Sequence, residues 1–159
     1  MRRSGFSLLV AGLIVVMAAP GALATTAADL VLTSASANVG SATSGTRVIF
    51  RASAKNLGPG TSQLDVTYLN AVNFAPKREV CIVPPSESGD INTPSPDTPS
   101  CEFANVPEGD RVGVKVAGVV SGDPGAAASI AFCTSNETSE GDGNPDNDCK
   151  AAVIKIVAG

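Results

Sequence analysis

The sequence contains no histidine and no tryptophan, and its aromatic residues are one tyrosine and five phenylalanines among 159 residues. Without histidine, the chain lacks the most frequent general base in enzymes and the commonest nitrogen ligand of metal ions. Serine, threonine and carboxylates are present, but their spacing selects no catalytic pair. Few aromatic side chains also leave little material for an apolar ligand pocket. We therefore expect a protein that is not an enzyme and that has no cofactor.

Long apolar runs are also scarce, and the N-terminus holds the most informative one. An uncharged stretch at residues 6–19 follows Arg2 and Arg3 and precedes Ala22-Leu23-Ala24. A basic start, a short apolar stretch and a small-x-small sequence are the three parts of a signal peptide. The stretch is shorter than the roughly 20 residues that a transmembrane helix requires. We predict general secretion with cleavage after residue 24, and no membrane span in the mature chain.

Basic residues are few, with 11 Lys and Arg against 15 Asp and Glu. Removal of a signal peptide at 1–24 takes away two arginines and no acidic residue, so the mature chain at 25–159 carries a net charge of −6. Nucleic acid and anionic membrane surfaces select clustered Lys and Arg, and no cluster is visible in the sequence. We expect neither as a partner. The mature length is typical of a single domain.

Four cysteines, Cys81, Cys101, Cys133 and Cys149, all follow the predicted signal peptide. Exported proteins normally have oxidised cysteines, so two disulfides are expected. Four cysteines allow three pairings. We favour Cys81 with Cys101 and Cys133 with Cys149, because each pair is adjacent in sequence and flanks a polar loop. A zinc site is disfavoured, since no histidine and no C-x-x-C spacing is present.

Beyond residue 24 the chain consists of short alternating runs separated by Gly, Pro, Asn and Asp, and no stretch keeps a helical apolar spacing through three turns. This pattern predicts an all-β domain. The best-defined strand is 47–55, where Val48, Phe50, Ala52 and Ala54 share a core face and basic residues share the other. About seven strands fit an immunoglobulin-like β-sandwich. The expected strands are 29–33, 47–55, 63–69, 78–83, 112–116, 128–134 and 151–157.

Two details of this pattern concern the second half of the chain. The segment 84–100 holds five prolines, which remove backbone donors, so it is predicted to be a surface loop that cannot form a strand. In the last strand, Ala152, Ile154 and Ile156 share one face and Val153 and Val157 share the other. The first of these faces is the favoured core face, and the periodicity leaves the second open.

A loop at residues 134–148 carries oxygen donors at alternate positions, namely Glu140, Asp142, Asn144, Asp146 and Asp148. Calcium binds six to eight such oxygens, so the loop is a calcium candidate, although it lacks the EF-hand spacing. Glycines and a proline interrupt the extended conformation that would align these donors. We favour a solvated loop closed at its base by Cys133 and Cys149, with no metal, and predict that calcium controls neither folding nor binding.

Three phrases occur in an order that resembles a known family. They are Ala28-Asp29-Leu30 leading to Val39-Gly40 and Asn56-Leu57-Gly58-Pro59, then Cys101-Glu102-Phe103 leading to Pro107-Glu108-Gly109, then Asn144-Pro145-Asp146-Asn147-Asp148 before Ala151-Ala152-Val153-Ile154. Together they look like the secreted bacterial surface repeats catalogued as domain of unknown function eleven. The resemblance spans nearly the whole mature chain. It implies an immunoglobulin-like sandwich in secreted or cell-wall proteins and brings no catalytic residue. Copies of the family usually stand in tandem, whereas this sequence holds one.

The sequence thus points to a noncatalytic exported module of the bacterial cell envelope or extracellular space, secreted, periplasmic or held at the cell surface. Its expected role is structural, adhesive or scaffolding, with envelope or extracellular proteins as partners. The alternative is a secreted binding protein that captures a small ligand or a protein through the loops at 84–100 and 134–148, because loops on a rigid sandwich often carry binding sites.

Overall fold

The computed structural model describes residues 29–83, 91–92, 100–135 and 148–159. These residues form strands, turns and connecting segments without any helix, which confirms the expected all-β class. Accordingly, the described part of the chain offers no helix with the length and apolarity needed to cross a membrane. The predicted signal peptide at 1–24 lies outside the described residues and stays a prediction, as does the division into 1–24 and 25–159.

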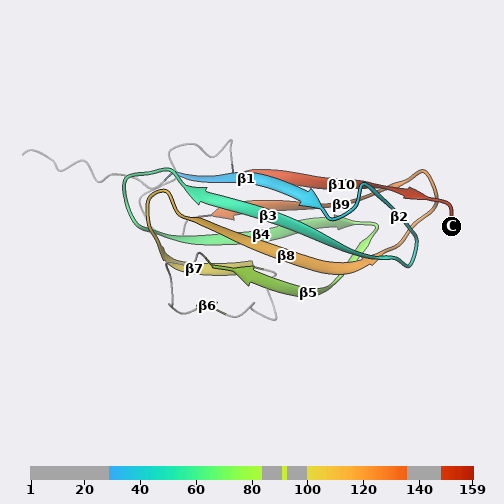
Figure 1. The fold of residues 1–159 in the computed structure, drawn as a ribbon, viewed down its shortest axis with the longest axis horizontal. Helices are drawn as coiled ribbons and strands as arrows, with labels where there is room; N and C mark the ends of the chain where they lie inside the picture. Colours follow the sequence, from blue (N-terminus) through green and yellow to red (C-terminus); the bar gives the residue numbers. More distant parts are fainter. Residues whose placement is uncertain (1–28, 84–90, 93–99, 136–147) are drawn as a thin grey trace, which may run out of the picture.

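The described strands form two sheets whose strands run along the long axis of the molecule (Figure 1). Sheet A has the order β1-β3-β8-β5, and sheet B has the order β2-β10-β9-β4-β7-β6. All pairs are antiparallel except the short pairing of β2 with β10. The strands are β1 (Leu30–Ala37), β2 (Ser41–Thr43), β3 (Arg47–Asn56), β4 (Ser62–Val72), β5 (Phe74–Ile82), β6 (Ile91–Asn92), β7 (Ser100–Val106), β8 (Arg111–Val120), β9 (Ala127–Ser135) and β10 (Cys149–Val157).

The core lies between the sheets and follows from the alternation of each strand. On β3, the four residues expected to face the core, Val48, Phe50, Ala52 and Ala54, are all buried. The rings of Phe50 and Phe74 meet edge to face, with centroids 4.8 Å apart. Burial of such a side chain stabilises the fold by about 1.5–3 kcal/mol. The favoured face of the last strand is also the buried one, because Ile154 and Ile156 are at most 2% exposed and Val153 is 61% exposed.

Two disulfides hold this sandwich, and they are the pairs that the sequence analysis favours. Cys81 on β5 is joined to Cys101 on β7, so the first bridge links sheet A to sheet B through the core. Cys133 and Cys149 lie directly opposite each other on β9 and β10, so the second bridge lies within sheet B. No cysteine is free. One bridge therefore fixes the spacing of the layers, and the other fixes the base of the loop between β9 and β10.

Three expectations about strands need correction. The described residues contain ten strands rather than about seven. Strand β7 and the short β2 are not among the strands expected from the sequence. The statement that 84–100 cannot form a strand is wrong at Ser100, the first residue of β7, and at Ile91–Asn92, which pairs with Phe103 and Glu102 of β7. Neither Ile91 nor Asn92 is proline, so both keep the backbone N–H groups that a ladder requires. The remaining residues of that loop, 84–90 and 93–99, lie outside the described ones.

Candidate functional site

The outer surface of sheet A gathers most of the basic residues of the chain. On β3 and β8, the residues that alternate with the buried ones face away from the core. These outward positions carry five Lys and Arg and no Asp or Glu, and the exposed Arg78 on the neighbouring β5 brings the count to six of the 11 basic residues. We call this surface the basic face; its cations are Arg47, Arg51 and Lys55 on β3, Arg111 and Lys115 on β8, and Arg78 on β5. An acidic chain therefore presents one strongly positive surface.

The register of β3 and β8 places like charges directly opposite each other. Arg51 is the partner of Lys115, and Lys55 is the partner of Arg111. Facing residues on neighbouring strands have Cβ atoms about 4.5–5.5 Å apart, and like charges in this arrangement destabilise a sheet. Within the described residues, none of these four cations has an ion-pair partner. Among the residues that the structure describes, the repulsion is therefore left uncompensated.

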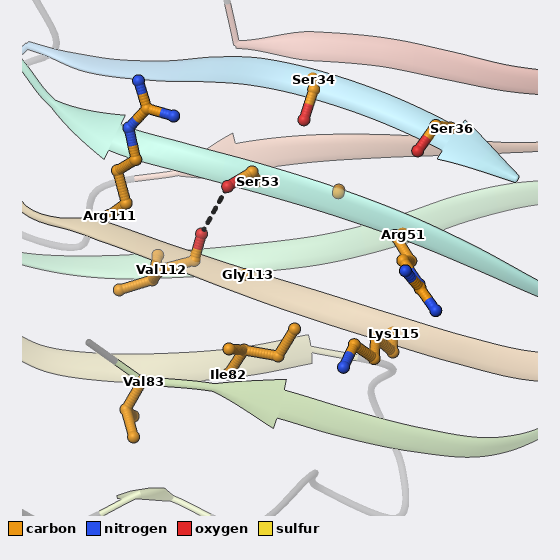
Figure 2. A pocket seen from close by; sticks show the side chains of 11 residues that line it. Ser34, Ser36, Arg51, Ser53, Ile82, Val83, Arg111, Val112, Gly113 and Lys115 are labelled. Atoms are coloured by element: carbon orange, nitrogen blue, oxygen red, sulfur yellow. Dashed lines mark hydrogen bonds between the residues drawn. The ribbon is translucent and has the colours of Figure 1, made fainter. Parts of the chain in front are cut away.

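Small residues along β8 leave two shallow depressions in the basic face. One has a volume of about 460 Å³ and lies over Gly113, between the β1 serines and Ile82. The other, of about 270 Å³, lies over Ala117 between Arg47 and Arg78. Figure 2 shows the first depression, with the side chains of Arg51 and Lys115 close together at one end and Arg111 at the other. The Lys115 side chain borders both depressions, and we refer to the two depressions together as the groove.

The two sides of this groove differ chemically. On the β1 side, Ser34 and Ser36 expose hydroxyl groups, and Ser53 on β3 donates a hydrogen bond of 3.3 Å to the Val112 carbonyl oxygen (Figure 2). On the β5 side, Val80 and Ile82 are 41% and 37% exposed. The groove thus combines cations, hydroxyl groups on one flank and aliphatic side chains on the other.

Asn56 ends β3, and its side chain holds the turn that follows this strand. The residue is fully buried, and its side-chain amide donates to the carbonyl oxygens of Gly60 at 2.7 Å and Val106 at 2.9 Å. Its side-chain oxygen accepts from the Gly58 N–H at 3.0 Å. The amide thus ties the turn after β3 to the end of β7. These contacts explain the residue types in the turn without a ligand.

A small polar cluster lies near the disulfide between the sheets. The Glu79 carboxylate oxygen is 3.4 Å from the Cys101 sulfur, and burial raises the pKa of this carboxyl above its ordinary value. Burial also raises the pKa of Tyr68, with a smaller contribution from the nearby Glu79 charge. Although Glu79, Cys81 and Cys101 lie close enough for metal binding, both sulfurs are consumed in the disulfide and cannot act as thiolate ligands.

The acidic loop is described only at its ends. The Asp148 backbone oxygen accepts a hydrogen bond of 2.8 Å from the Thr134 N–H, and one Asp148 carboxylate oxygen lies 3.3 Å from the Thr134 hydroxyl. Glu140, Asp142, Asn144 and Asp146 lie outside the described residues. The expectation that calcium does not bind there therefore stays a prediction.

The basic face is the feature that sequence reasoning missed. Part of the signal was visible, since Arg47, Arg51 and Lys55 share the outward face of one strand. Lys115 and Arg111, however, are 60 or so positions away, and only the pairing of β3 with β8 brings them alongside. The statement that the chain has no clustered Lys and Arg is therefore wrong, although the expected absence of nucleic acid as a partner is itself untested.

Comparisons with known proteins bear on the fold. No protein-family model and no curated relative matches the sequence. Among solved structures, the CARDB domain of a Pyrococcus furiosus protein, solved in complex with di-metal ions, has a TM-score of 0.51 and 10% identity over 82% of this chain and 90% of that one. The sixth cohesin of scaffoldin B from Acetivibrio cellulolyticus has a TM-score of 0.47 and 14% identity over 82% and 99%. The architecture expected from the sequence, an immunoglobulin-like β-sandwich with two disulfides, is thus confirmed.

Proposed function

We propose that this chain is a noncatalytic, exported binding module of the bacterial cell envelope or extracellular space, and that it holds its partner on the basic face of sheet A. The observation that carries the proposal is the pairing of Arg51 with Lys115 and of Lys55 with Arg111. Where a sheet surface serves only solubility, mixed charges are favoured, because opposite charges on facing strands attract and stabilise the sheet. Uniform positive charge instead suits a surface that meets an anionic partner.

The export part of the proposal rests on the chemistry of the chain. Two disulfides and no free cysteine are typical of proteins that fold in an oxidising compartment. A signal peptide at 1–24, cleavage after Ala24 and a cell-surface, periplasmic or secreted location are consistent with this chemistry. Membership in the surface-repeat family named above is part of the same proposal and is supported by the shared sandwich architecture.

The proposed mechanism is electrostatic docking on a rigid support. The inner side of sheet A is packed in the core, so the outward side chains project from a backbone that does not have to rearrange on binding. The rigid backbone limits the entropy lost on binding, and the positive charge accelerates the encounter with an anionic partner.

The test is co-sedimentation of the purified mature protein with the isolated envelope fraction of the producing organism. We expect the protein to sediment with the envelope at low salt and to be released as salt rises, because ions screen exposed charges. The variant Arg51→Glu/Lys115→Glu should stay in the supernatant. The variant Lys150→Glu/Lys155→Glu has the same net charge but changes sheet B, so it should sediment like the unchanged protein.

Two results would contradict the proposal. Equal sedimentation of both variants and the unchanged protein would mean that the basic face is not the docking surface. No sedimentation of the unchanged protein at any salt concentration, with its circular dichroism spectrum intact, would mean that the envelope offers no partner for this module.

A further inference from the structure

We infer that the partner on the basic face is a linear acidic polysaccharide, a sugar polymer that carries carboxylate groups and lies along β3 and β8. This inference rests on the proposed function and specifies the chemistry of its ligand. It is carried by three observations: the cations form a stripe, most of them are arginines, and the flanks of the stripe combine hydroxyl groups with aliphatic side chains.

The shape of the charged surface favours a linear ligand. Arg47, Arg51 and Lys55 recur every fourth residue along β3. Lys115 and Arg111 lie beside this row on β8, and Arg78 lies one strand further, on β5, so the cations cover a width of three strands, about 10 Å. Eight residues along a strand span about 26 Å, whereas neighbouring strands are about 4.8 Å apart. The cations therefore form a narrow stripe that follows the strands, as does the groove over Gly113 and Ala117. A polymer of several sugar rings fits such a stripe.

The type of cation favours carboxylates as the charged groups. Four of the six cations are arginines, and Arg47, Arg51, Arg78 and Arg111 are all exposed. A planar guanidinium presents parallel N–H groups that match the two oxygens of a carboxylate, and such bidentate pairs are stronger than neutral hydrogen bonds. Since the stripe contains no acidic residue, these forks are available to a ligand.

The flanks of the stripe favour sugar over other polyanions. A pyranose ring carries hydroxyl groups at its rim and apolar C–H groups on its face. Ser34 and Ser36 on one flank can exchange hydrogen bonds with the hydroxyl groups, and Val80 and Ile82 on the other can contact the C–H groups.

The experiment measures binding of galacturonic acid hexamers to the mature protein by isothermal titration calorimetry. The matched ligand is the methyl-esterified hexamer, which keeps the sugar chain and loses the charge. We expect the acidic hexamer to bind and its ester to show no measurable binding. Arg51→Gln/Lys115→Gln should weaken binding at least about 100-fold, because two charge-assisted hydrogen bonds are lost. Lys150→Gln/Lys155→Gln, with the same net charge, should leave the affinity within about twofold, because neither residue lines the groove.

Further ligands decide between this inference and other polyanions. If inorganic polyphosphate, single-stranded DNA or vesicles containing phosphatidylglycerol bind as tightly as the acidic hexamer, the face senses charge alone, and the polysaccharide assignment is wrong. If no acidic hexamer binds while sedimentation with the envelope still depends on Arg51 and Lys115, the assignment fails and the proposed function stands. If sedimentation is also independent of these residues, the proposed function fails as well.

Discussion

The two surfaces of sheet A are made by the same strands and differ in composition: the inner surface is apolar and buried, and the outer surface is positively charged and exposed. On the inner surface of β3 and β8, Phe50 and Val114 are fully buried and pack against the rest of the core. On the outer surface, Arg51 and Lys115 face each other without a compensating charge among the described residues. Apolar burial on the inner surface stabilises the folded state, whereas repulsion between facing cations on the outer surface destabilises it. This difference separates the residues that stabilise the domain from those that we propose to bind its partner.

Alternation along a strand makes this separation possible. Consecutive side chains point to opposite sides, so a substitution on one side leaves the other side nearly unchanged. Gly118, for example, is on the inner side, where an added Cβ would collide with the Phe74 ring and the Ala75 carbonyl oxygen. Gly113 forms part of the groove floor on the outer side. The two glycines lie five residues apart. Gly118 leaves space for the Phe74 ring in the core, and Gly113 leaves space for the depression on the outer surface.

The largest expected effect comes from the inner surface. Phe50→Ala should reduce the free energy of unfolding by about 3–5 kcal/mol, because it removes a fully buried ring and leaves a cavity beside Phe74. Urea unfolding followed by circular dichroism measures this loss. The affinity of the folded fraction for the acidic hexamer should stay within about twofold, because the Phe50 side chain points to the opposite side of the sheet from Arg51 and Lys115. A large loss of affinity in the folded protein would show that the two surfaces are coupled.

A smaller effect of opposite sign is expected on the outer surface. Lys115→Gln removes the repulsion with Arg51 and should increase the free energy of unfolding by about 0.2–1 kcal/mol at low salt, the range of cross-strand pairs. The gain should vanish near 1 M salt, where the screening length is about 3 Å. Urea unfolding at both salt concentrations tests this. A loss of stability at low salt would mean that Lys115 stabilises the fold, and it would contradict the contrast between a stabilising inner surface and a destabilising outer surface.

The smallest effect concerns Glu79, the carboxylate on the inner side of β5. Burial raises the pKa of this group above its ordinary value of 4.5, so the folded state favours its protonated form. Its contribution to stability is complete below pH 4.5 and is lost as pH rises through the raised pKa. Glu79→Gln should therefore be more stable than the unchanged protein at neutral pH, and the two should converge in acid. Thermal melts across this range measure the gap; a constant gap would contradict the burial effect.

Much of the fold could be predicted because local patterns determine it. Val48, Phe50, Ala52 and Ala54 alternate with four charged or polar residues and one apolar residue, Ile49, and this pattern favours burial of one face of the strand. The segment at Ser100–Val106 was harder to assign, because its alternation is broken near Asn105, which has a φ of 56°. The pairing at Ile91–Asn92 could not be foreseen at all, since two residues between prolines have no periodicity.

The candidate site could be predicted only in part, for a similar reason. One row of cations, Arg47, Arg51 and Lys55, is visible in the sequence as the polar side of an amphipathic strand. Such a row is typical of any solvated strand, so by itself it predicts no function. The site forms only because β8 places cations directly opposite those of β3, and because none of the outward positions of β3, β8 and β5 carries an acidic residue.

By itself, the sequence determined the all-β class, the core face of the main strands and the choice of cysteine pairs, because alternation, turn residues and short separations act over a few residues. Only the tertiary structure decided that β3 pairs with β8, which sets Arg51 against Lys115 and Lys55 against Arg111. These partners are more than 50 positions apart, and a shift of one residue in the register would turn the cations of one strand toward the core. Burial of the valines of β8 forbids that shift, so the packing of the inner surface fixes the charge pattern of the outer one.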